Sequence, residues 1–237
     1  MDIKGENLIK PVRMEGLRVV GDPNEYAKRY READELLYID TVASLYGRNN
    51  LSEILRKTTE SIFIPITVGG GIRCIEDVQR LFGNGADKVA INTGVVERPE
   101  LISEIARRYG SQAIVVSVEA KRSRGWEVYT HGGRERTGRQ VVEWIKECIA
   151  RGAGEILITS VDQEGTLQGF DLELIRACSP FIPCPFVVSG GCGTLGHITQ
   201  ALEAGADAVA VASVLHYGKL SIGEIREHLE SDVQNRR

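Results

Sequence analysis

The sequence has little that would mark a metalloprotein, a disulfide-rich protein or a nucleic-acid-binding protein. Its four histidines are scattered without metal-ligand spacing, so we expect no metal. Its five cysteines are odd in number and include no CxxC pair, which favours free thiols in a reducing cytosol. Charge is nearly balanced, with 29 basic against 33 acidic residues and no basic block, which excludes the usual electrostatic footprint of a nucleic-acid-binding surface.

Long apolar runs are also missing. The longest are of strand length, far short of a membrane span. No charged and then apolar leader opens the chain, so we expect no secretion signal. These absences predict a cytoplasmic protein that binds neither membrane nor nucleic acid, and we expect no cofactor.

The most informative feature that is present is an internal repeat. Residues 67–93 (TVGGGIRCIEDVQRLFGNGADKVAINT) recur without a gap as residues 187–213 (VVSGGCGTLGHITQALEAGADAVAVAS). In each copy an apolar run ends in glycines, a helical pattern follows, and a second apolar run closes on a small polar residue. Two such units half a chain apart predict a barrel of two similar halves with paired ligand loops.

Short β-branched runs alternate with amphipathic stretches along the chain, as in βαβ units of a parallel sheet. With 237 residues and no linker, this predicts one α/β domain over residues 1–237, a (β/α)8 barrel. Strands are expected at about Leu36–Asp40, Ile64–Val68, Lys88–Ile91, Ala113–Val118, Ile156–Thr159, Phe186–Val188 and Ala208–Val211. Helices are expected at about Asn24–Glu32, Leu51–Glu60, Ile75–Leu81, Pro99–Arg108, Gly138–Arg151, Leu172–Ala177, Leu195–Glu203 and Ile222–Glu230.

This count gives seven strands, whereas a closed barrel needs eight. The missing strand is the first, because only Met1 precedes Asp2. We expect it to be truncated by a start later than that of the natural gene, since an open barrel exposes strand edges. Residues Trp126–Thr130, followed by Gly132 and Gly133, predict a hairpin inserted after the fifth strand.

Several acidic residues follow predicted strands, where barrels carry their catalytic groups. Asp2 and Glu119 start the two halves of the repeat and are expected to face each other across the barrel mouth. Opposed carboxylates can act as general acid and general base if their surroundings separate their pKa values. The alternative is that such acids cap loops or pair with Lys4, Lys10 or Lys121. The other acids at such positions are Asp40, Asp162 and Glu164.

The glycine-rich segments Gly69–Gly71 and Gly190–Gly193 each lie between a predicted strand and a predicted helix. Backbone N–H groups at such a helix start can bind an anion. The residues that close the next strand of each copy, Asn92–Thr93 and Ser213, can add side-chain hydrogen bonds. The segments could be mere tight turns, but the matched pair favours a bisphosphorylated ligand that spans the mouth.

The chain resembles a known family in several strings: GDPNEYAKRY, DELLYIDTVAS, ITVGGGIR, GADKVAINT, YGSQAIVVSVEAKR, GAGEILITSVDQEGT and VVSGGCG. It is similar to the cyclase subunit of imidazole glycerol phosphate synthase, of the histidine pathway. The resemblance implies a (β/α)8 barrel that takes ammonia from a glutaminase partner. The ammonia condenses with a bisphosphorylated ribulosyl aminoimidazole carboxamide intermediate, which yields imidazole glycerol phosphate and an aminoimidazole carboxamide ribotide.

The resemblance also implies roles for individual residues. Its two catalytic aspartates fall on Asp2 and Glu119. It assigns phosphate or substrate binding to Lys10, Gly71, Asn92, Thr93, Glu164, Gly165, Thr166, Gly191 and Ser213, with Lys10 on a mobile loop. It assigns a charged gate for ammonia, at the opposite face, to Glu35, Lys88 and Glu155. Thr67 and Ser189 would mark the route inward.

The departures from the family pattern keep other functions open. Glu119 and Glu164 replace aspartates, the first loop (GENLIKPVRMEGLRVV) differs, and an arginine of the gate has no counterpart before Asp2. A longer carboxylate arm displaces the reacting group, and about 1 Å of misplacement can cost on the order of 100-fold in rate. One alternative is a paralogue that uses the ammonia to amidate a surface-sugar precursor. Another is a non-catalytic barrel that only binds a glutaminase.

Overall fold

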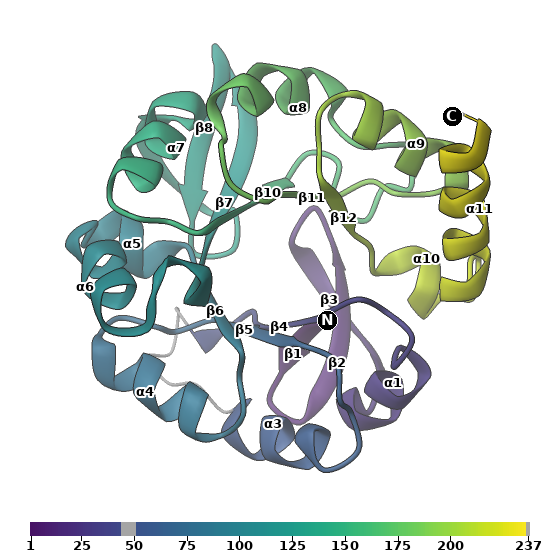
Figure 1. The fold of residues 1–237 in the computed structure, drawn as a ribbon, viewed down its shortest axis with the longest axis horizontal. Coiled ribbons are helices and arrows are strands. Elements are labelled where there is room, and N and C mark those ends of the chain that lie inside the picture. The colour runs from purple at the N-terminus through teal and green to yellow at the C-terminus, as the bar shows by residue number, and fades with distance from the viewer. Residues whose placement is uncertain (44–50, 236–237) are drawn as a thin grey trace.

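The computed structural model describes residues 1–43 and 51–235 and contains a twelve-stranded sheet. Eight of these strands run parallel and curl around a common axis, and helices surround them (Figure 1). The order of the parallel strands is β1-β4-β5-β6-β7-β10-β11-β12. Their bounds are β1 Asp2–Lys4, β4 Leu36–Asp40, β5 Ile66–Gly69, β6 Lys88–Ile91, β7 Ile114–Ser123, β10 Glu155–Ser160, β11 Phe186–Ser189 and β12 Ala208–Ala210.

The expected (β/α)8 barrel is present, although the sequence pattern showed only seven of its parallel strands. The eighth is β1, which pairs in parallel with β4 in the register Asp2↔Ile39 and Ile3↔Asp40. With three residues it is too short to show an apolar run, which is why the sequence pattern missed it. Within the described residues β1 and β12 share no ladder, so the barrel has a seam between them.

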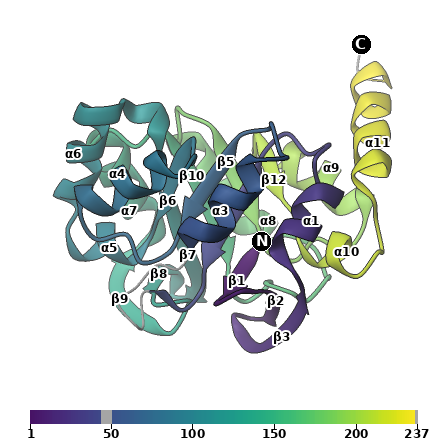
Figure 2. The same cartoon turned by 90° about the horizontal axis from the view of Figure 1, so that it is seen from below.

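Two antiparallel hairpins extend the sheet beyond the parallel strands, and Figure 2 shows both on the same face of the molecule. The first comprises β2 (Asn7–Val12) and β3 (Glu15–Gly21), and β1 pairs with β2 in the register Asp2↔Ile9. The second comprises β8 (Gly125–Thr130) and β9 (Glu135–Gln140), and β8 pairs with the long strand β7. The expected hairpin after the fifth parallel strand is therefore confirmed, whereas the β2–β3 hairpin was not anticipated.

The described helices follow the expected pattern, with shifted ends. Helix α7 begins at Val141 rather than Gly138, because Gly138 (φ 74°) belongs to β9. The bounds are α1 Pro23–Arg29, α3 Leu51–Thr59, α4 Ile75–Gly83, α5 Thr93–Glu97, α6 Glu100–Tyr109, α7 Val141–Ala150, α8 Leu172–Cys178, α9 Leu195–Glu203, α10 Ser213–His216 and α11 Ile222–Asn235. None of these helices is long and apolar enough to cross a bilayer.

The internal repeat is visible in matched contacts. Asp87 accepts a hydrogen bond from the backbone N–H of Ile66 at 2.8 Å, and Asp207 accepts one from Phe186 at 2.9 Å. Each aspartate thus fastens the start of one strand to the loop before the next. The sequence identity between the two halves therefore corresponds to the same local structure in both.

Burial divides the apolar residues into two sets. The larger set packs between the strands and the helices and includes the fully buried Trp144, Tyr38 and Phe186. The smaller set, Ala90, Val115 and Leu157, lies inside the curled sheet. The wide apolar layer outside the strands stabilises the fold, while the few apolar residues inside the sheet line the wall of a cavity.

Candidate functional site

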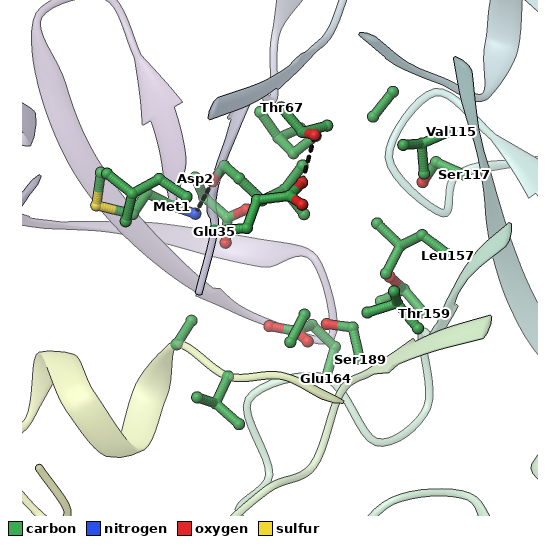
Figure 3. Close-up of a pocket in the computed structure, with 18 of the residues that line it drawn as sticks. Met1, Asp2, Glu35, Thr67, Val115, Ser117, Leu157, Thr159, Glu164 and Ser189 are labelled. Atoms are coloured by element: carbon green, nitrogen blue, oxygen red, sulfur yellow. Dashed lines mark hydrogen bonds between the residues drawn. The ribbon is translucent and has the colours of Figure 1, made fainter. Parts of the chain in front are cut away.

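A cavity of about 560 Å³ lies inside the curled sheet. Its wall includes Asp2, which pairs with Ile39 near the carboxyl end of β4, and Glu119 on β7. It also includes Glu35, just before β4, and Glu155, the first residue of β10. Ser117, Thr159 and Ser189 also line this cavity, and Figure 3 shows them on the wall. One cavity therefore connects the predicted catalytic end with the predicted ammonia gate.

The first polar cluster at the catalytic end joins Asp2, Lys10 and Glu164. Lys10 lies on β2, not on a mobile loop, because the β1–β2 hairpin folds it back beside Asp2. Its ammonium forms an ion pair with Asp2 at 3.1 Å and a second, closer one with Glu164. The expectation that a strand-end acid pairs with Lys10 is confirmed for Asp2.

Burial and charge act in opposite directions in this cluster. Burial disfavours the ionised form of Asp2, but the Lys10 ammonium and the chain's N-terminal amine together outweigh it and lower the pKa of Asp2. Burial also disfavours the Lys10 cation, yet its two carboxylate partners raise the Lys10 pKa. Burial raises the pKa of Glu164, only partly offset by Lys10. Asp2 is therefore an ionised carboxylate that can accept a proton.

Glu119 stands on β7, four strands from β1 in the sheet order, and lines the same cavity. Its Oε2 accepts a hydrogen bond from the Gly133 N–H at 2.7 Å. Burial raises the pKa of Glu119 to about 7, even though the backbone N–H of Gly133 and the side chain of Asn92 favour the charged form. A carboxyl with this pKa is poised for general acid–base work near neutral pH.

The glycine loops adopt backbone conformations that require glycine. Gly70 and Gly190 have φ values of 103° and 98°. A Cβ would lie 2.4 Å from the Asp40 carbonyl oxygen at Gly70 and 2.8 Å from the Ser160 carbonyl oxygen at Gly190. Both loops thus cross the end of a neighbouring strand at close range, which a side chain would prevent.

The predicted anion residues of the first half lie together at the cavity. Gly71, Asn92 and Thr93 all line it. Asn92 donates to the Tyr129 carbonyl at 3.0 Å, and Thr93 Oγ1 accepts from the His131 N–H at 3.1 Å. The Asn92 side-chain oxygen is buried and has no partner among the described residues.

The predicted anion residues of the second half are not on the wall of this cavity. Gly191 packs against Gly169, whose N–H donates to the Gly191 carbonyl at 2.7 Å. Gly165 (φ 73°) packs against the end of β2, and Thr166 donates to the Gln163 carbonyl at 2.8 Å. Ser213 is buried at the start of α10. The two halves therefore differ in openness, although their sequences match.

The opposite end of the cavity carries an ionic cluster. Lys88 forms ion pairs with Glu35 at 2.6 Å and with Glu155 at 2.7 Å. Thr67 donates a hydrogen bond to Glu35, shown as a dashed line in Figure 3. Burial works against the Lys88 cation, but hydrogen bonds to Glu155 and Glu35 raise its pKa. The three charged residues predicted for a gate are thus in direct contact.

The sequence reasoning missed a Tyr–His pair at the cavity. The hydroxyl of Tyr30 and Nδ1 of His216 are 2.7 Å apart, and both residues line the wall. Burial lowers the His216 pKa to about 3, so the imidazole is neutral. The available signal was that His216 lies one turn after Ser213, which closes the second repeat. Among the described ranges 1–43 and 51–235, no group of three or more His, Cys, Asp or Glu residues could hold a metal ion.

A family model and individual relatives place the chain in the same family. Residues 1–221 match a family model described as "Histidine biosynthesis protein". The chain is 61% identical over 199 residues to "Imidazole glycerol phosphate synthase subunit HisF" of Legionella pneumophila, covering 82% of this chain and 94% of that protein. Proteins of the same name from Myxococcus xanthus (strain DK1622) and Thermobifida fusca (strain YX) are 48% and 46% identical. They align over 95% and 98% of this chain and 91% and 94% of their own.

Proposed function

This chain belongs to the histidine biosynthesis protein family, and from that premise we propose that it is the cyclase of an imidazole glycerol phosphate synthase. In this proposal it condenses ammonia with a bisphosphorylated ribulosyl aminoimidazole carboxamide intermediate. Ring closure and cleavage then release imidazole glycerol phosphate and an aminoimidazole carboxamide ribotide. The (β/α)8 fold and the high identity over most of the chain support this activity.

The observation that carries the proposal is a pair of carboxyl groups with separated pKa values in one cavity. Lys10 and the N-terminal amine together keep Asp2 ionised against the effect of burial, whereas burial raises the pKa of Glu119 to about 7. Condensation of ammonia with a carbonyl, ring closure and cleavage each require proton transfer. We assign the general base to Asp2 and the general acid to Glu119, because their charge states suit these roles.

The glycine loop of the first half, which lines the cavity, supports binding of one substrate phosphate, and the internal repeat supports a second phosphate at the matching loop, although that loop lies off the cavity wall. Gly71, Asn92 and Thr93 would bind one phosphate, and Gly165, Gly191 and Ser213 the other, with Thr166 beside them. Backbone N–H groups in glycine-rich loops suit phosphate because no side chain blocks the approach. Glu164 would contact the substrate between the two ends while Lys10 neutralises it.

The ionic cluster at the far end supports delivery of ammonia from a partner. The similar proteins are named as subunits of a synthase, and we propose a glutaminase as the partner of this chain, in a heterodimer. Ammonia would enter past Glu35, Lys88 and Glu155 and pass Thr67 and Ser189 on the cavity wall. All five cysteines are free thiols, which suits the cytoplasm as the site of action.

A second candidate function is amidation of another acceptor, such as a surface-sugar precursor, by the same ammonia. It is favoured by Glu119, whose longer arm is fixed by the Gly133 N–H, and by Glu164, whose carboxylate is engaged by Lys10. Both changes alter the pocket around the reacting atoms while the gate residues remain.

Growth of a histidine auxotroph that lacks its cyclase separates the two candidates. With the chain expressed beside the host glutaminase, or alone with ample ammonium, we expect growth without histidine. The matched strain carries Asp2→Asn and should not grow. Failure of the wild-type chain to restore growth under both conditions, despite soluble expression, would reject the cyclase and favour the other acceptor.

A further inference from the structure

The turn that joins β8 to β9 has an unusual backbone. Three consecutive residues, His131, Gly132 and Gly133, have φ values of 54°, 69° and 72°. The Arg134 N–H then donates to the Thr130 carbonyl at 3.0 Å and closes the turn. A run of left-handed residues costs conformational free energy, so other contacts must hold it in place.

Those contacts come from the candidate site. Asn92 donates to the Tyr129 carbonyl at 3.0 Å, and the His131 N–H donates to Thr93 Oγ1 at 3.1 Å. The Gly133 N–H donates to Glu119 at 2.7 Å. The turn is thus fastened to both proposed phosphate-binding side chains and to the proposed general acid.

Arg134 is therefore placed at the mouth of the cavity by a fixed backbone. Its exposed side chain lines the cavity and has no hydrogen bond or ion pair with any other described residue. Arg134 directly follows Gly133, whose N–H donates to Glu119, and its positive charge favours the ionised form of that carboxyl.

The antiparallel ribbon formed by the end of β7, β8 and β9 (residues 119–140) carries other arginines, and they differ from Arg134 in their contacts. Arg136 pairs with Glu127 at 2.7 Å, Arg139 pairs with Glu147 at 2.9 Å, and Arg122 pairs with Glu173. Arg124, in the β7–β8 turn, is exposed but does not line the cavity. Within the described part of the ribbon, Arg134 alone offers an unpaired guanidinium to the cavity.

We propose that Arg134 binds the ligand phosphate at the Asn92–Thr93 end of the cavity, as a binding residue that lies outside the internal repeat. This rests on the proposed function, which requires a phosphorylated ligand. A guanidinium can present two parallel N–H donors to phosphate oxygens, a geometry that lysine cannot reproduce. A phosphate bound beside Glu119 would also favour its protonated form, the form that a general acid requires.

Inorganic phosphate is a suitable probe, because it tests binding without turnover. In a titration of the ¹⁵N-labelled chain, the backbone amide signals of Thr93 and Gly132 report on the Arg134 end. Those of Gly191 and Ser213 report on the other half of the barrel. The amide signals thus give a separate dissociation constant for each half.

For Arg134→Ala we expect the constant reported by Thr93 and Gly132 to rise about tenfold, the size typical of a charge-assisted hydrogen bond. The constant reported by Gly191 should be unchanged. Arg134→Lys should give an intermediate value, and the control Arg124→Ala should leave both constants unchanged.

An unchanged constant at Thr93 and Gly132 in Arg134→Ala would overturn the proposal. So would the absence of saturable shifts at these amides in the wild-type chain. If the wild-type chain shows cyclase turnover but Arg134→Ala leaves the phosphate dissociation constant unchanged, only the proposed role of Arg134 is rejected. If Arg134→Ala weakens phosphate binding but the wild-type chain shows no cyclase turnover, only the proposed activity is rejected.

Discussion

Replacing Glu119 by glutamine keeps the size and shape of the side chain but removes its titration. In the wild-type chain burial raises the Glu119 pKa to about 7. If the protonated carboxyl is the general acid, its population falls from about 90% at pH 6 to about 10% at pH 8 for a group of this pKa. Ammonia-dependent turnover should therefore fall about tenfold over this range, after correction for the fraction of free ammonia.

The same substitution has a signature in folding stability. The folded-state pKa of about 7 exceeds the ordinary value of 4.5, so the folded chain favours the protonated form. The stability that this preference contributes is complete below pH 4.5 and is lost as the pH rises through 7. The loss amounts to at most about 3 kcal/mol, from the shift in pKa. Glu119→Gln should not show this loss.

Two assays measure these effects. Turnover is followed with saturating substrate from pH 5.5 to 8.5, and urea unfolding is compared at pH 5 and pH 8. Glu119→Gln should lower turnover by roughly 100-fold or more and lose the inflection near pH 7. A wild-type profile that is flat through pH 7, or an inflection that persists in Glu119→Gln, would refute the assignment of Glu119 as the acid.

Three further outcomes are expected. Asp2→Asn should lower turnover with ammonium by roughly 100-fold or more with little change in KM, and an unchanged rate would exclude Asp2 as the base. Lys88→Ala should impair glutamine-driven turnover more than ammonium-driven turnover in the glutaminase complex. The exposed control Lys28→Ala should affect neither. Equal loss of turnover with both nitrogen sources, together with a lower melting temperature, would instead indicate a structural ion-pair cluster. Gly190→Ala should lower the free energy of unfolding in urea by about 1–3 kcal/mol, because φ is 98° and the new Cβ would meet a backbone carbonyl. The control Gly83→Ala, on α4 where a Cβ meets no other atom, should be neutral or stabilising by up to about 1 kcal/mol.

Much of the barrel could be predicted, because buried parallel strands and amphipathic helices leave strong periodic patterns. The strands Leu36–Asp40 and Lys88–Ile91 and the helix Leu195–Glu203 have the expected bounds. The internal repeat predicted matched loops, and the paired Asp87 and Asp207 contacts agree with it.

The hairpins were harder to predict because their pairing is decided by tertiary contacts. Strand β2 contains Pro11 and has four consecutive buried residues, so it shows no alternation. Gly138 and Gln140 precede a helical pattern and were assigned to it, but pairing of Gln140 with Glu127 places them in β9. The local sequence does not show either of these strand pairings.

The sequence predicted which residues belong to the candidate site but not which of them contact one another. Asp2, Glu119 and Lys88 follow from strand ends and from the family resemblance. The turn that fixes Glu119 could not be foreseen, since it depends on how β8 and β9 lie against Asn92 and Thr93. For the same reason the position of the second half's anion residues off the cavity wall could not be predicted from the repeat.

The most direct test of the proposed activity uses the purified chain, the bisphosphorylated ribulosyl aminoimidazole carboxamide intermediate and an ammonium salt. Chromatography follows the loss of the intermediate and the formation of products. Imidazole glycerol phosphate and the aminoimidazole carboxamide ribotide should form in equal amounts, only when ammonium is present, and not with Asp2→Asn. An intermediate that persists unchanged with the folded wild-type chain and excess ammonium would contradict the assignment of this barrel as a cyclase.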